Sequence, residues 1–185
     1  MKNTSLLLKH LLTILLLSTV WLAGKAQSWQ ILSDQTEIRF SGTGAEGTFS
    51  GLTGTIIFDP EDPKGGNFDV QLSAGTIDTG NKTKDKHARG KNWFDIEKYP
   101  SATFTSSDMR QMDDQWEVDG VIEIHGIQKA ITIPFTFQEK ADRGIFKGDF
   151  SLDRNDFEIY GPFFGFVVGD EFRVELVVST KRMGE

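Results

Sequence analysis

The sequence predicts an all-β domain of about eight antiparallel strands. After residue 27, large apolar side chains recur at every second position in run after run, for example Ile131, Ile133, Phe135 and Phe137. Successive side chains of a strand point to opposite faces, so this alternation makes one face of each strand apolar. Clusters of Gly, Asn and Asp between the runs are typical of tight turns. Eight such strands match an up-and-down barrel or a two-sheet sandwich, and the pattern does not separate the two.

The elements follow one another with short connections. Strands are expected at 36–41, 53–58, 68–72, 102–105, 116–124, 130–137, 146–152 and 169–180. Glycines at positions 42, 44 and 47 predict a tight turn before Phe49, and His125-Gly126-Ile127-Gln128 predicts a hairpin turn. Pro134 falls in the polar phase of its strand, which indicates an edge or a bulge. The charged stretch Asn81–Phe94 interrupts the alternation and predicts a short helix or helical loop.

The first 26 residues have the pattern of a cleavable secretory signal. Lys2 and Lys9 are followed by an apolar run from Leu11 to Leu22, and small residues precede a cut after Ala26. The run is shorter than the roughly 20 residues that a spanning helix needs. We therefore expect a signal peptide at 1–26, a single domain at 27–185, and a periplasmic or secreted protein that is not embedded in a membrane.

The charge and cysteine content exclude several classes of function. The formal net charge of −7 becomes −10 when the three lysines of the leader are removed. Such an acidic domain argues against nucleic-acid binding, which needs clustered Lys and Arg. The chain has no cysteine, which excludes thiol catalysis and thiolate metal sites.

No motif supports catalysis or a metal centre. His87 lies in a mixed-charge segment with Asp85, and His125 precedes Gly126 at the expected hairpin tip, where a polar residue usually faces water. A metal site would need three or four converging ligands. No Ser lies in a Gly-x-Ser-x-Gly turn, and no Gly-rich phosphate loop leads from a strand into a helix. We expect neither an enzyme nor a cofactor.

The fifteen phenylalanines leave two interpretations open. They fill a solid core, or they line an apolar tunnel for a flexible hydrocarbon chain. The segment Tyr160–Val168 is apolar without alternating and is interrupted by Gly and Pro, which indicates a loop that serves either as a pocket mouth or as a plug. The tunnel interpretation uses these residues: Phe40, Ile56, Phe58, Phe104, Ile122, Ile124, Ile133, Phe135, Phe150, Phe163, Phe164, Phe166, Phe172 and Val174.

Several segments together resemble the YceI-like family of secreted bacterial proteins that bind polyisoprenoids or lipids. The most specific is Asp85-Lys86-His87 followed by Trp93-Phe94-Asp95 and by the run from Tyr99 to Phe104. The similarity covers about Trp29 to Lys181 and includes Gly120–Lys129 and Leu152–Phe157. Two positions depart from the family pattern. Ser41-Gly42-Thr43-Gly44 stands where a histidine is common, and Glu158 stands where a glycine is common.

The resemblance implies a lipocalin-like extended antiparallel barrel with one short helical segment and a long isoprenoid or alkyl lipid in its interior. It also implies a non-catalytic carrier and allows a homodimer. Candidates for contact with the lipid head group are His87, Arg89, Lys91 and Arg154. A packed barrel that binds a protein partner is the alternative, and a lipid-modifying enzyme is the weaker third hypothesis.

Overall fold

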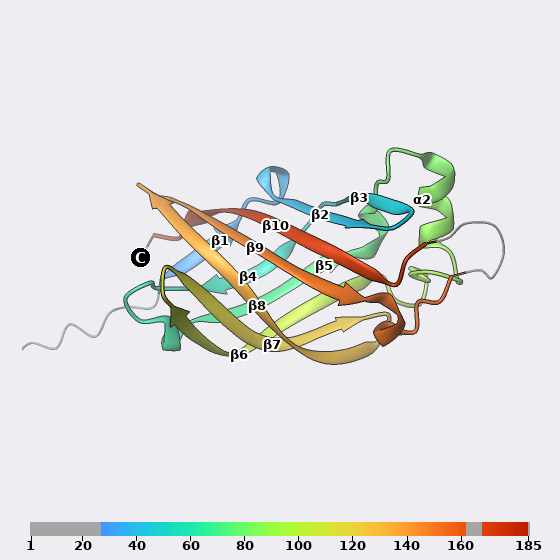
Figure 1. The fold of residues 1–185 in the computed structure, drawn as a ribbon. Helices are drawn as coiled ribbons and strands as arrows, with labels where there is room; N and C mark the ends of the chain where they lie inside the picture. The colour runs from blue at the N-terminus through green and yellow to red at the C-terminus, as the bar shows by residue number, and fades with distance from the viewer. Residues whose placement is uncertain (1–26, 162–167, 185) are drawn as a thin grey trace, which may run out of the picture.

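The structure is a computed structural model, which describes residues 27–161 and 168–184. It is a closed antiparallel barrel with one short helix, α2 (Lys82–Arg89), near one end (Figure 1). The strands are β1 (Ser28–Ile31), β2 (Glu37–Gly42), β3 (Ala45–Phe49), β4 (Thr53–Ile57), β5 (Asn67–Ser73), β6 (Ser101–Met112), β7 (Gln115–Ile124), β8 (Ile127–Lys140), β9 (Arg143–Asp153) and β10 (Glu171–Arg182). The prediction of an all-β barrel is confirmed, and the sandwich is excluded.

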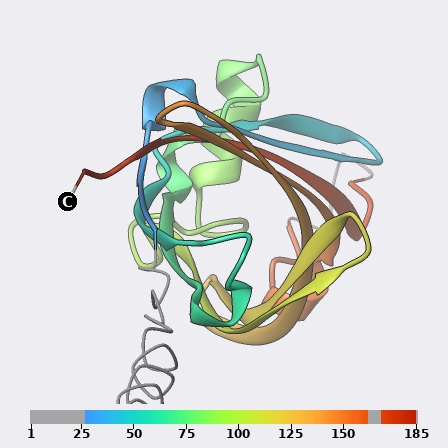
Figure 2. The same ribbon diagram turned by 90° about the vertical axis from the view of Figure 1, so that its left-hand side faces the viewer.

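Eight strands close the barrel, and two extend the sheet. β1 pairs with both β4 and β10, so β1 and β4 to β10 form the ring that Figure 2 shows end on. β10 pairs with β1 near its C-terminal end and with β2 over Phe172–Val177, and β3 lies outside β2. A short 3-10 helix at Ser33–Gln35 separates β1 from β2. β1 and β2, which follow one another in the chain, therefore pair with two successive parts of the same edge of β10.

Several strand boundaries differ from the sequence-based prediction. The four residues of β1 were not expected, and the predicted turn before Phe49 contains the strand β3. β6 runs to Met112, beyond the expected end at Thr105, because a bulge between Ser106 and Asp108 shifts the phase of alternation. After the bulge the inward position passes to Met109, which is buried. The helix ends at Arg89, earlier than the expected Phe94.

The β8–β9 ladder covers only half of β8. It ends at the pair Phe135–Gly148, so Ile127 to Pro134 pairs with β7 alone. Pro134 lacks an N–H and sits where the second ladder stops, as the pattern indicated. The short 3-10 helix η4 (Arg154–Phe157) lies beside this unpaired edge, where Lys129 forms an ion pair of 3.1 Å with Asp156.

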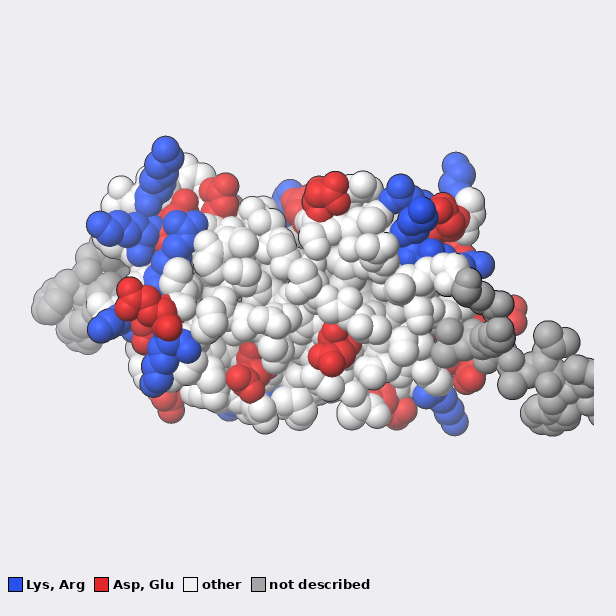
Figure 3. All heavy atoms as spheres, turned by 180° about the vertical axis from the view of Figure 1, so that it is seen from behind, with Lys and Arg blue, Asp and Glu red and all other residues white. Residues whose placement is uncertain are grey.

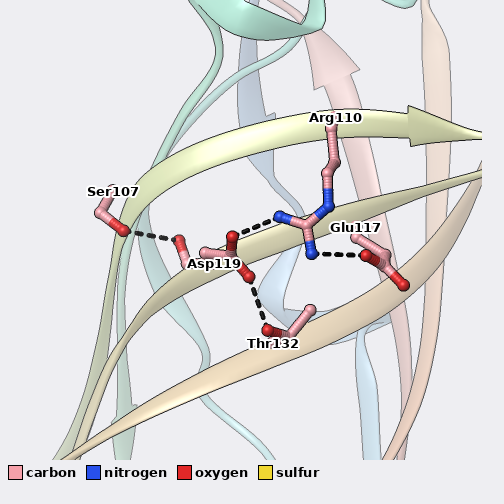
Figure 4. Close-up of polar contacts among 5 residues, drawn as sticks. All are labelled: Ser107, Arg110, Glu117, Asp119 and Thr132. Carbon is pink, nitrogen blue, oxygen red and sulfur yellow. Dashed lines mark hydrogen bonds and ion pairs between the residues drawn. The ribbon is translucent and has the colours of Figure 1, made fainter.

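A polar clamp on the outer face spans the bulge in β6. The Arg110 guanidinium binds the carboxylates of Asp119 and Glu117 on β7 (Figure 4). Asp119 also accepts a hydrogen bond of 2.5 Å from the Thr132 hydroxyl on β8, and its carbonyl accepts one of 3.3 Å from Ser107. These bonds lower the pKa of Asp119 and raise that of Arg110, because each charge is stabilised by its partner.

Candidate ligand-binding site

The barrel interior is hollow at the end that carries α2. The cavity has a volume of about 380 Å³, within the range of roughly 300–1,000 Å³ that is usual for small-molecule sites. The inward side chains of β2, β5, β6, β7, β9 and β10 form its wall, which is predominantly apolar. Phe40 and Phe172 are two of the lining residues, with ring centroids 6.1 Å apart. The cavity therefore suits a hydrocarbon guest.

The opposite half of the barrel is solid. Phe58 has no exposed surface, and its ring packs against those of Phe68, Trp116, Phe135, Phe137 and Phe146 at centroid separations of 5.1 to 6.4 Å. All five contacts are edge-to-face, the arrangement that aromatic quadrupoles favour. We call this cluster, with Trp29, the aromatic plug. Phe68, Phe135 and Phe146 also face the cavity, so the plug is its floor.

The structure places most of the predicted tunnel residues on one continuous surface. Ten of them line the cavity: Phe40, Ile56, Phe104, Ile122, Ile124, Ile133, Phe135, Phe150, Phe172 and Val174. Phe58 does not, because it lies behind the floor within the aromatic plug. Phe163, Phe164 and Phe166 lie outside the described residues.

Polar lining residues gather at the end of the cavity beside α2, and we call this end the mouth because lining residues of the helix are exposed there. His87 and Lys84 come from α2 and are exposed, whereas Tyr99 and His125 are half-buried. His125 begins the two-residue turn between β7 and β8 with φ 54°, and Gly126 follows with φ 77°. The sequence indicated a water-facing residue at this turn. It could not show that the Tyr99 ring approaches from a distant segment, with a centroid separation of 4.4 Å.

Two head-group candidates instead brace the rim. Arg89 donates from Nε to the Gly75 carbonyl at 2.8 Å and from the guanidinium to the Ile77 carbonyl at 2.7 Å. Arg154 donates to the carbonyls of Ile159, Gly169 and Val168 at 2.6, 3.0 and 3.3 Å, and pairs with Asp170 at 2.6 Å. These bonds tie both guanidinium groups to backbone carbonyls, and Arg154 also borders the cavity. Lys91 is exposed and is not part of the cavity wall.

Asp85 anchors α2 beside the mouth, a role the sequence analysis did not assign. Its carboxylate accepts hydrogen bonds from the Thr79 hydroxyl at 2.7 Å and the Thr79 amide at 2.8 Å. The hydroxyl bond contributes most to lowering the pKa of Asp85, followed by the amide bond. Asn81 caps the helix by accepting from the amides of Thr83 and Lys84. Helix position is therefore fixed by side-chain hydrogen bonds.

Across residues 27–161 and 168–184, no three His, Asp or Glu side chains converge as metal ligands would. Within the same ranges no helix has the length and apolar character required to cross a bilayer.

The comparison with family models decides the affiliation of the chain. Residues 29–180 match the model of the YceI-like domain. The chain belongs to the YceI-like family. A UPF0312 protein from Pseudomonas savastanoi is 31% identical over 173 residues, which cover 84% of this chain and 90% of that relative. Protein YceI from Salmonella arizonae is 27% identical over 144 residues, covering 73% and 72% of the two chains.

Solved structures share the fold of this YceI-like chain. BcnA from Burkholderia cenocepacia superposes with a TM-score of 0.76 at 23% identity, over 80% of this chain and 98% of that one. A polyisoprenoid binding domain from Saccharophagus degradans gives a TM-score of 0.65 at 12% identity, over 86% and 100%. At these identities the likeness concerns the barrel itself.

Proposed function

We propose that the domain is a non-catalytic carrier that holds an isoprenoid or alkyl lipid inside the barrel. The observation that carries the proposal is the apolar cavity, which is open near α2 and ends on the aromatic plug. A site of this shape takes up a hydrocarbon tail from one end and shields it from water. The polyisoprenoid binding domain from Saccharophagus degradans shares the fold, which supports the same ligand class here.

The energetics favour a lipid. Burial of ten methylene groups contributes about 8 kcal/mol at roughly 0.8 kcal/mol each. This is on the order of the free energy of micromolar binding, before the cost of ordering the chain is subtracted. The apolar wall can thus supply affinity without a charged contact.

The place of action proposed for the carrier is the periplasm or the exterior of the cell. The support is the sequence of residues 1–26, with its lysines, its apolar run and its small residues before the cut. Mass measurement of the mature protein from its host would give an N-terminus near Gln27. A retained leader would contradict cleavage and would indicate an N-terminal membrane anchor instead.

The experiment that tests the carrier is organic extraction of the purified protein followed by mass spectrometry. The matched variant is Ala102→Trp, because Ala102 is half-buried, lines the cavity and pairs with Leu72. We expect a lipid in the wild-type extract and at least a tenfold lower yield from the variant. Thr105→Trp places the same ring at an exposed position of β6 and should leave the yield unchanged.

A second measurement separates an empty carrier from a protein that does not bind lipid. Trp93 lines the cavity, so its fluorescence should respond when farnesol is added to the extracted protein. An extract without lipid, together with no uptake of farnesol, would refute the proposal and favour the packed interaction module.

A further inference from the structure

His125 is a polar residue of the cavity wall whose orientation is fixed by the residues around it. Its backbone adopts φ 54°, a left-handed conformation that few residues other than glycine adopt. Its Nδ1 lies 3.0 Å from the Phe157 carbonyl oxygen, and its ring packs against Tyr99. A Cβ on the neighbouring Gly126 would come within 2.6 Å of the Tyr99 ring, so glycine permits this close packing. The position of the imidazole is thus set by the backbone turn, by the Phe157 carbonyl and by the Tyr99 ring.

The contact with Phe157 determines which ring nitrogen carries the proton. A carbonyl oxygen only accepts hydrogen bonds, so Nδ1 must donate in this pair. The neutral imidazole has one N–H, and Nε2 is then an acceptor with a free lone pair. Among the residues that the structure describes, none forms a hydrogen bond with Nε2, and the His125 side chain lines the cavity.

The other polar side chains at the mouth are either exposed or already hydrogen-bonded within the protein, as Arg154 is. Lys84, His87 and Glu46 are exposed and reach the cavity from its rim. The Thr79 hydroxyl donates to Asp85 and is occupied. A hydrogen-bond acceptor whose position is already fixed loses little conformational entropy when a ligand binds. Such an acceptor therefore favours ligands that carry a donor more strongly than an acceptor on a mobile side chain does.

We propose that the head group of the lipid donates a hydrogen bond to Nε2 of His125, so the site prefers long-chain alcohols to ligands that only accept. The inference rests on the proposed carrier function and names the chemistry of its ligand. An isoprenoid with a terminal hydroxyl fits, since its tail occupies the apolar wall while its O–H reaches the imidazole. An ether or a quinone with the same tail has no proton to donate and leaves Nε2 unpaired.

The test compares farnesol with farnesyl methyl ether, which has the same tail but no donor. Trp93 fluorescence measures both dissociation constants on extracted protein. We expect farnesol to bind about fivefold more tightly, which corresponds to about 1 kcal/mol, the usual net contribution of a neutral hydrogen bond. In His125→Gly the turn keeps its conformation at no steric cost, and the two ligands should bind equally.

Ala141→Gly is the matched control. Ala141 begins the two-residue turn between β8 and β9 with φ 56°, at the far end of the barrel from His125. This variant makes the same kind of backbone change and should keep the wild-type preference for farnesol. It also shows whether a glycine in such a turn unfolds the protein.

The outcomes separate the two proposals. If both ligands bind wild type equally, the hydrogen bond to His125 is refuted and the carrier stands. If neither binds, this inference falls, and an extract without lipid then refutes the carrier as well. The ¹⁵N spectrum of the His125 ring provides an independent check. We expect a proton on Nδ1 alone, and a proton on Nε2 in the ligand-free protein would overturn the inference.

Discussion

The two halves of this barrel are built from the same strands but held together differently. In the plug half, Phe58 touches five other aromatic rings and has no exposed surface. In the cavity half, smaller inward residues such as Ala102 and Val174 leave space between the walls. Hydrogen bonds donated by Arg89 and Arg154 and accepted by Asp85 fasten the segments around the mouth. Packing stabilises one end, and polar braces stabilise the other.

The difference teaches what alternation can and cannot indicate. Period two identifies the inward residues in both halves equally well, because it reflects only the geometry of a strand. Whether the interior is full depends on how many rings meet in one layer and on whether neighbouring strands stay paired. Here the ladder between β8 and β9 ends at Phe135, at the level where the plug gives way to the cavity.

The largest expected effect is the loss of the plug's central ring. Phe58→Ala should lower the free energy of unfolding by about 3–5 kcal/mol, because it leaves a void among rings that cannot collapse into it. Urea denaturation monitored by circular dichroism measures this change. The affinity for farnesol should change little in the fraction that remains folded, because Phe58 does not line the cavity.

The matched change in the cavity half should reverse this pattern. Phe150 is half-buried and lines the cavity, so part of its ring already faces open space. Phe150→Ala should reduce the stability by less than about 2 kcal/mol and should weaken the binding of farnesol more than Phe58→Ala does. Equal losses of stability in the two variants would contradict the division into a solid and a hollow half.

Removing the hydrogen bonds around the mouth should lower the stability in a different way. Arg154→Met keeps the apolar stem but removes the donors to Ile159, Val168 and Gly169. We expect a loss of about 2–3 kcal/mol, since hydrogen bonds from charged groups contribute more than neutral ones. Amide hydrogen exchange should become faster at 158–161 and 168–170. The exchange rates in the strands that carry the aromatic plug should stay the same. Uniform acceleration would mean that Arg154 stabilises the whole barrel rather than its rim.

The sequence predicts which residues pack inside this protein better than it predicts the hydrogen bonds around the mouth of the cavity. The inward phases of β5, β7, β9 and β10 follow from residues a few positions apart. In contrast, the bond that Thr79 donates to Asp85 and the one that His125 donates to Phe157 depend on how separate segments meet. Glu158 illustrates the same limit. It stands where the family often has glycine, and it adopts φ 55°, a conformation for which glycine is better suited.

The plug and the mouth should also differ in their response to acid. The pKa of Asp85 is lowered in the folded state, so its contribution is present above the ordinary carboxyl pKa and is lost as the pH falls through the folded value. Asp85→Asn should therefore melt at a lower temperature than wild type at pH 7. The difference should narrow as the pH approaches 3. A difference that is constant with pH would show that the charge of Asp85 does not support α2.

The smallest effect is expected from the clamp on the outer face. Lys and Arg side chains lie mainly toward the two ends of the face in Figure 3, including the end with α2. Arg110, which is 40% exposed, belongs to neither the plug nor the mouth. Because water and salt screen such pairs, Arg110→Met should lower the melting temperature only slightly at low salt. In 1 M NaCl the difference should vanish. A large effect that survives salt would mean that the clamp holds the β6 bulge in place, and that the outer face, like the plug, determines the shape of the interior.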